Sequence, residues 1–257
     1  MIESRLRAAG CVFAEQEAAL LREAARDEAD LVRLVDERVA GQPLEVLVGW
    51  AEFCGLRVVV EPGVFVPRQR TSYVVRLGAA GLRAGDVAVD LCCGTGAIGA
   101  ALAAAVPGLE VHAADVDPAA VRCARRNLKH VHEGDLYDAL PDQLRGRVDV
   151  LAVNAPYVPH DAIALMPPEA RLHEPGVALD GGPDGLDVQR RVVREAGAWL
   201  APGGRLLIET GVAQASLTRD LMTAAGLAAA VHHDDDLDAT VVVGRPPGRV
   251  GRSSRQV

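Results

Sequence analysis

Two short segments of the chain combine side chains and backbone geometry that could do chemistry. The first is Asp90-Leu91-Cys92-Cys93-Gly94-Thr95-Gly96, which follows an apolar run and opens onto a segment that favours a helix. Glycines in such a turn let the backbone approach a ligand, and a helix start presents unpaired N–H groups. We therefore expect a nucleotide cradle whose contacts come from Asp90, Cys92, Cys93, Gly94, Thr95 and Gly96.

The second segment, Asn154-Ala155-Pro156-Tyr157, follows the apolar run 148–153. The Asn154 side-chain oxygen and the Ala155 carbonyl, whose direction Pro156 fixes, can accept both N–H bonds of an acceptor nitrogen. Tyr157 supplies an aromatic wall. We predict that Asn154 and Tyr157 are catalytic, that residues 154–157 bind substrate, and that Asn154 also faces the cofactor. A cradle beside a nucleophilic nitrogen predicts methyl transfer from S-adenosylmethionine.

The glycine turn also permits a rival interpretation. Gly94 to Gly99 spells G-x-G-x-x-G, and Asp115 lies 21 residues beyond Gly94, as in NAD-binding turns. However, four residues separate the apolar run from the first glycine. The Asp90 carboxylate would also crowd a pyrophosphate, whereas it suits the ammonium group of a methionine moiety. S-adenosylmethionine is therefore the favoured cofactor.

Three further aspartates follow expected strands. Asp115 can accept both hydroxyls of the cofactor ribose, and Asp117 is better placed to cap the helix that starts at Pro118. Asp135, with Leu136 beside it, either reaches the adenine amino group or is a plain loop residue.

Composition restricts the classes of protein. The chain has 257 residues, 49% hydrophobic content and a net charge of −8, enough for a large α/β core plus a small domain. The acidic charge makes nucleic acid an unlikely partner. We find no signal peptide and no apolar run that would span a membrane, so we expect a cytoplasmic protein. The five cysteines follow no disulfide or zinc spacing, and no metal is expected.

The elements that position these residues alternate along the chain. Apolar runs predict strands at 87–90, 111–115, 148–153 and 204–210, helical periodicity predicts helices at 97–105, 118–129, 187–200 and 213–225, and 228–245 suits an antiparallel edge pair. This alternation predicts an α/β fold with a doubly wound, mostly parallel sheet. We assign residues 1–48 to a helical domain, 49–70 to a β-hairpin linker with a turn at Pro62-Gly63, 71–246 to the methyltransferase domain and 247–257 to a flexible tail.

The chain resembles the HemK/PrmC-type protein-(glutamine-N5) methyltransferases over nearly its whole length. The resemblance rests on residues 154–157 and on the segments Gly49–Leu56, Pro62–Arg68, Asp184-Gly185-Leu186 and Glu209-Thr210-Gly211 with Gln214. It implies a class I S-adenosylmethionine-dependent fold with a seven-stranded sheet and an N-terminal domain that recognises a protein substrate. It further implies methylation of a glutamine in a Gly-Gly-Gln loop of a peptide-chain release factor or a related protein.

Five positions depart from the family pattern. Ala155 replaces a proline, Cys92 replaces the first glycine of the turn, and Leu136 replaces a tryptophan. Arg70 and Ser72 replace two carboxylates near the substrate entrance, which we expect to shift the preference toward acidic or neutral acceptors.

Two other functions stay open: methyl transfer to a small molecule or nucleobase amino group, and a cofactor-binding module with weak turnover. Cys92 and Cys93 precede a helix, where thiol pKa values fall. His130, His132 and Glu133 are expected to flank a strand rather than bind metal, and 232–236 to form a solvated loop.

Overall fold

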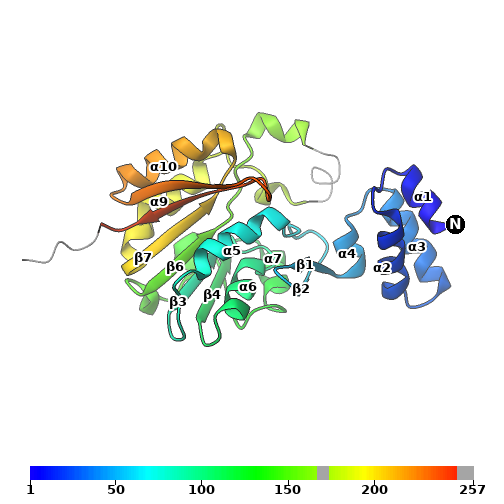
Figure 1. Cartoon of the computed structure of the whole chain (residues 1–257), viewed down its shortest axis with the longest axis horizontal. Helices are drawn as coiled ribbons and strands as arrows, with labels where there is room; N and C mark the ends of the chain where they lie inside the picture. The colour runs from blue at the N-terminus through cyan, green and yellow to red at the C-terminus, as the bar shows by residue number, and fades with distance from the viewer. Residues whose placement is uncertain (167–173, 248–257) are drawn as a thin grey trace, which may run out of the picture.

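The larger part of the molecule is a seven-stranded sheet with helices on both faces, and a group of short helices lies at the opposite end (Figure 1). The computed structural model describes residues 1–166 and 174–247. The strand order is β5-β4-β3-β6-β7-β9-β8. The first five run parallel, whereas β9 pairs antiparallel with β7 and with β8. The predicted mostly parallel sheet and its antiparallel edge pair are therefore confirmed.

The strands fall close to the predicted ranges. They are β3 (Val87–Leu91), β4 (Glu110–Asp115), β5 (His130–Glu133), β6 (Val148–Val153), β7 (Leu200–Glu209), β8 (Ala228–Asp234) and β9 (Ala239–Arg245). β7 begins earlier than predicted because Leu200 already pairs with Val148.

Alternate residues of the central strands pack into two separate cores. Val89 and Leu91 belong to a core that includes Trp199 of α9, whereas Ala88 belongs to one that includes Leu102 of α6. Burial on both faces is what a parallel sheet requires. It holds the carboxyl ends of β3, β4 and β6 in fixed positions.

The helices of this part cover the two faces of the sheet. They are α5 (Ser72–Ala79), α6 (Ala97–Ala105), α7 (Pro118–Ala124), α9 (Asp187–Trp199) and α10 (Ala215–Ala224). α7 is shorter than the predicted helix 118–129. Beyond Ala124 the N–H groups of Arg126 and Asn127 bond to carbonyls three residues back, which tightens and ends the last turn.

The N-terminal helices have a core of their own. They are α1 (Ile2–Ala8), α2 (Ala14–Ala24), α3 (Glu28–Val39) and α4 (Leu44–Val48). Leu6, Leu21 and Leu34 are buried together among them. A hairpin of β1 (Trp50–Phe53) and β2 (Leu56–Val59) follows. The predicted turn at Pro62-Gly63 is present, with the Val64 N–H donating to the Glu61 carbonyl, but it follows the hairpin. The hairpin itself reverses at Cys54-Gly55, where both residues adopt positive φ.

The histidine clusters also lie differently than predicted. His130 and His132 are inside β5 rather than beside it, and the ring nitrogens of His132 and His112 are 2.9 Å apart. His232 and His233 belong to β8, not to a loop. Within residues 1–166 and 174–247, no three His, Cys, Asp or Glu side chains are grouped to hold a metal ion.

None of the helices formed by residues 1–166 and 174–247 is long and apolar enough to cross a membrane. The predicted flexible tail falls, except for Pro247, outside the part of the chain that the structure describes.

Candidate active site

A cavity of about 390 Å³ lies at the carboxyl ends of β3, β4 and β6. The chain proceeds from β3 outward to β5 and then returns to β6, and open α/β sheets bind ligands at such a switch point. Most of the predicted site residues line this cavity: Cys92, Cys93, Gly94, Thr95, Asp115, Asp135, Leu136, Asn154, Ala155, Pro156 and Tyr157. Asp90 and Gly96 are not among its lining residues.

The turn between β3 and α6 forms the floor of the cavity. Cys92, Gly94 and Gly96 all adopt left-handed backbone conformations, with φ of 58°, 54° and 77°. A side chain at position 96 would lie 2.9 Å from Leu128, so this position requires glycine. Cys92 takes the same conformation with a side chain, at a cost of about 1–2 kcal/mol. The departure at position 92 is therefore a local strain rather than a different path of the chain.

Asp90 lies beneath the cavity wall. The side chain is fully buried, Oδ2 accepts the Gly99 N–H at 2.8 Å, and Oδ1 has no hydrogen-bond partner among the described residues. Burial raises the pKa of Asp90 to about 8. A cationic group bound above this carboxyl would favour its ionised form, but direct contact of Asp90 with an ammonium group stays a prediction.

Asp115 ends β4 and faces the cavity. Oδ2 accepts the Gly94 N–H at 2.8 Å and Oδ1 accepts the Asp117 N–H at 2.9 Å. These bonds fix the carboxylate, and each oxygen keeps a lone pair for a ribose hydroxyl. Asp117 caps α7 through the Ala119 N–H, as predicted.

The far wall is formed by Asp135 and Leu136. Asp135 is paired with Arg191 of α9 at 2.6 Å, a partner that the sequence analysis missed. Leu136 is 8% exposed and has a φ of 49°. A carboxylate and an apolar side chain are thus adjacent at this wall, and their contact with adenine stays a prediction.

The two thiols of the turn behave opposite to the prediction. Burial raises the pKa of both Cys92 and Cys93, and the carboxylates of Asp90 and Asp115 raise it further. Desolvation raises the thiol pKa by more than the helix N-terminus lowers it. Both cysteines therefore stay protonated thiols.

The Asn154–Tyr157 segment leaves β6 and forms the opposite side of the cavity. The Asn154 Nδ2 donates to Thr71 Oγ1 at 3.4 Å. Ala155 is 2% exposed, and the Tyr157 hydroxyl accepts a hydrogen bond from Arg70 at 2.7 Å. Thr71, from the short helix η1 (Gln69–Thr71), is a second residue that the sequence analysis did not single out.

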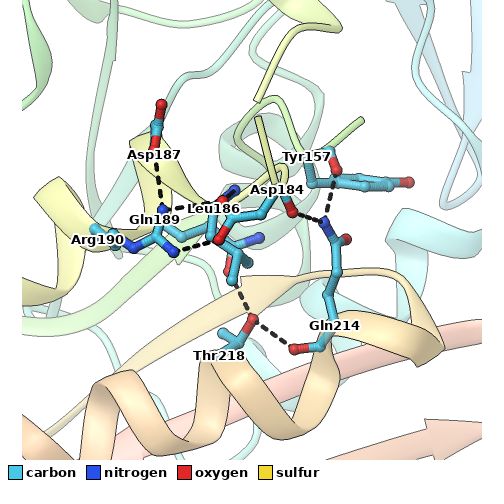
Figure 2. A network of polar contacts seen from close by, with 8 residues as sticks. All are labelled: Tyr157, Asp184, Leu186, Asp187, Gln189, Arg190, Gln214 and Thr218. Atoms are coloured by element: carbon cyan, nitrogen blue, oxygen red, sulfur yellow. Dashed lines mark hydrogen bonds and ion pairs between the residues drawn. The ribbon is translucent and has the colours of Figure 1, made fainter. Parts of the chain in front are cut away.

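A loop behind this segment fixes its backbone. The Gln214 Nε2 donates to the carbonyls of Tyr157 and Asp184, both at 2.9 Å (Figure 2). Thr218 in turn donates to Gln189 at 2.7 Å. A Cβ at Gly185 would lie 2.2 Å from the Tyr157 carbonyl oxygen, so only glycine fits this contact.

The arginines around the cavity are all matched by carboxylates. Arg68 pairs with Glu174, Arg70 with Glu209, and Arg191 with Asp135. Ser72 is not among the lining residues. The charge of Arg70 is compensated by Glu209, and the electrostatic shift toward acidic or neutral acceptors stays a prediction.

The charges of the cavity fit S-adenosylmethionine. The lining residues include five carboxylates and only these three arginines. This excess of negative charge suits a ligand that carries a sulfonium and an ammonium group, and an adenosine diphosphate would be repelled. Asp115, Asp135 and residues 92–95 would hold the nucleoside and methionine parts.

The fold and this site define a class I S-adenosylmethionine-dependent methyltransferase. The model of the family "Methyltransferase small domain" matches residues 55–170. A crystal structure of a methyltransferase from Pyrococcus furiosus has a TM-score of 0.55 and 19% identity, covering 74% of this chain and 88% of that one. That likeness concerns the fold alone.

Sequence relatives identify the family within this class. The release factor glutamine methyltransferase of Geobacter sulfurreducens is 35% identical over 224 residues, which are 85% of this chain and 77% of that protein. The chain belongs to the release factor glutamine methyltransferase family. A 4-amino-L-phenylalanine/4-methylamino-L-phenylalanine methyltransferase of Streptomyces pristinaespiralis is also similar, with 38% identity over 75% of this chain and 69% of that protein. The resemblance, the fold class and the cofactor predicted from the sequence are thus confirmed, and the NAD interpretation is set aside.

Proposed function

We propose that this chain transfers a methyl group from S-adenosylmethionine to the side-chain amide nitrogen (N5) of a glutamine in a protein, and that this protein is a peptide-chain release factor or a related protein. One observation carries the proposal: Asn154 turns its Nδ2 toward Thr71. The Asn154 oxygen is thereby left to the cavity, where it can accept an N–H from the acceptor. The Geobacter relative's name supports the choice of acceptor.

The acceptor nitrogen must direct its lone pair at the methyl carbon. An amide lone pair is delocalised into the carbonyl, so the site has to hold the nitrogen in a reactive geometry. The Asn154 oxygen and the Ala155 carbonyl accept its two N–H bonds, which orients the lone pair and stabilises the positive charge that develops. The proton leaves to solvent after the C–N bond has formed, so no general base is required.

The remaining groups orient the acceptor and exclude water. Tyr157 presents its ring to the flat amide, and burial raises the pKa of its hydroxyl, so the ring stays neutral. When bound, S-adenosylmethionine supplies the activated methyl group. Asp115 and the turn at 92–96 serve to place that group opposite Asn154.

A second candidate is methyl transfer to the amino group of a small aromatic amino acid. The Streptomyces pristinaespiralis relative favours it, because its name gives such a substrate. The paired state of Arg68 and Arg70 weighs against it, since neither offers an unmatched cation to an amino acid carboxylate. A protein acceptor needs no such cation.

The test is a transfer assay with methyl-labelled S-adenosylmethionine. The purified chain is incubated separately with a release factor, with the same factor carrying Gln→Ala in its Gly-Gly-Gln loop, and with 4-amino-L-phenylalanine. We expect label in the first sample only, at a kcat/KM of about 10⁴ M⁻¹s⁻¹ or more. Label in the amino acid and none in the factor would replace our proposal with the second candidate.

A further inference from the structure

The side chains of Asn154 and Tyr157 share one support behind the cavity. Arg70 and Thr71 are consecutive residues of η1, and each contacts one of them: Arg70 Nη2 donates to the Tyr157 hydroxyl at 2.7 Å, and Thr71 Oγ1 accepts from Asn154 at 3.4 Å. Two neighbouring residues therefore hold the two side chains to which the reaction is assigned.

Arg70 and Thr71 both lie beside Glu209, the last residue of β7. Its side chain is 2% exposed, and Oε1 accepts the Arg70 Nε–H at 3.3 Å. Burial raises the pKa of Glu209, and the nearby Thr71 hydroxyl and the charge of Arg70 oppose this rise. Oε2 of Glu209 is buried and has no hydrogen-bond partner among the described residues. Glu209 is not a lining residue of the cavity, so it does not itself meet a substrate.

The hydrogen-bonding capacity of a carboxylate determines how the amide group of Asn154 is oriented. An ionised carboxylate only accepts hydrogen bonds, so a Thr71 hydroxyl that turns its proton toward the unpartnered Oε2 of Glu209 keeps only lone pairs for Asn154. Asn154 must then present its NH₂ group to Thr71. Its oxygen is thereby turned toward the cavity, which is the orientation an acceptor amide needs.

We propose that Glu209 is the positioning residue of the acceptor site, which orients Asn154 through Thr71 and Tyr157 through Arg70. This inference rests on the proposed function for its consequence in catalysis. It also gives Arg70 a role: where the family pattern has a carboxylate, this chain has the cation that compensates Glu209 and holds Tyr157.

The composition of the chain makes the inference unusually easy to test. It has two asparagines, Asn127 and Asn154, and three tyrosines, Tyr73, Tyr137 and Tyr157. Labelling with ¹⁵N-asparagine and ¹³Cζ-tyrosine therefore gives two side-chain NH₂ signals and three ring signals in an NMR spectrum of the whole chain. Asn127, bonded to Thr95 and Val59, and Tyr137, bonded to Val192, are internal controls.

Three variants distinguish the contact of Thr71 with Asn154 from the contact of Arg70 with Tyr157. We expect Glu209→Gln to move the signals of Asn154 and Tyr157 and to leave those of Asn127 and Tyr137 in place. Thr71→Val should move Asn154 alone, and Arg70→Lys, which keeps the charge beside Glu209, should move Tyr157 alone. If Glu209→Gln fails to fold, the other two variants decide. Signals of Asn154 and Tyr157 that stay unchanged in folded variants would overturn the proposal.

A kinetic measurement distinguishes positioning from mere stability. Glu209→Gln should lower kcat by about 10- to 100-fold, since misplacement by about 1 Å can cost that much, while the Kd for S-adenosylmethionine stays within twofold. An unchanged kcat would contradict the inference. The NMR result needs no acceptor, so a wild-type protein that transfers no methyl group would refute the proposed function and leave the role of Glu209 to be judged separately.

Discussion

Asp115 illustrates how single residues of the cavity do two tasks. Its oxygens accept the N–H groups of Gly94 and Asp117, which shapes the turn, and they remain available to ribose hydroxyls. We predict that Asp115→Ala weakens S-adenosylmethionine binding roughly 10- to 100-fold, because a charge-assisted hydrogen bond contributes about 1.5–3 kcal/mol. Calorimetry measures the affinity, and a melting curve checks the fold. Unchanged affinity in a folded variant would remove Asp115 from the cofactor site.

The raised pKa of Asp90 leads us to predict that the stability of the protein depends on pH. Burial raises its pKa from 3.8 to about 8. Between these values the native state holds a proton that the unfolded state releases, so this residue's contribution to stability falls as the pH rises from 4 to 8, by up to about 1.4 kcal/mol per unit. Asn cannot ionise, so Asp90→Asn should be the more stable protein at pH 8, and the difference should vanish near pH 4. Chemical unfolding at pH 4, 6 and 8 measures this, and parallel profiles would contradict it.

At the scale of residues, the sequence predicted the residues that line the cavity better than those that support them. Cys92–Thr95, Asp115 and residues 154–157 carry recognisable spacing, and they all line the cavity. Thr71 and Arg191 were not singled out, and Glu209 stood out only as part of the family segment Glu209-Thr210-Gly211, not as a partner of Arg70. Arg191 meets Asp135 across 56 residues and Arg70 meets Glu209 across 139, so only the folded chain brings them together.

At the scale of elements, the loop from Gly181 to Leu186 supports the acceptor segment. Gly185 adopts a φ of 77°, and an added Cβ would lie 2.3 Å from Gln214 Nε2 as well as close to the Tyr157 carbonyl. Gly185→Ala should therefore break the Gln214 contact, lower the stability by about 1–3 kcal/mol and reduce kcat. Thermal melting and kinetics measure the two effects.

Gly211→Ala is the matched control for this change. Gly211 has a φ of −72°, and its nearest Cβ neighbour would lie at 3.4 Å, so alanine should be tolerated. Equal losses in both variants would show that the surroundings of Gln214, and not the Gly185 contact in particular, are sensitive.

The elements themselves were predictable where their pattern is long. β6 and α6 begin and end at the predicted residues because apolar runs and helix formers mark them clearly. The reversal of the hairpin at Cys54-Gly55 and the end of α7 were not predicted. Pro62-Gly63 forms the turn that its residue types favour, but this turn follows β2. α7 ends where Asn127 donates to Val59 and Thr95, contacts that local sequence does not reveal.

At the scale of the whole molecule, the N-terminal helices lie apart from the sheet, at the opposite end of the molecule (Figure 1). Phe13, which is 64% exposed, borders a groove with Leu20 and Leu44. If residues 1–48 recognise a protein acceptor, Phe13→Ser should raise KM for that acceptor by about tenfold, as loss of an aromatic anchor does. The Kd for S-adenosylmethionine should not change. An unaltered KM would exclude Phe13 from acceptor recognition.

We propose that the Asn154 side chain orients an acceptor amide for methyl transfer. The most direct measurement compares wild type and Asn154→Ala in two assays: binding of S-adenosylmethionine by calorimetry, and labelled methyl transfer to a release factor, with the modified glutamine located by mass spectrometry. We predict cofactor affinity within a few-fold of wild type and a transfer rate lower by about 10²–10³, the typical cost of losing one preorganised transition-state partner. Near-normal transfer to the same glutamine by Asn154→Ala would contradict the account.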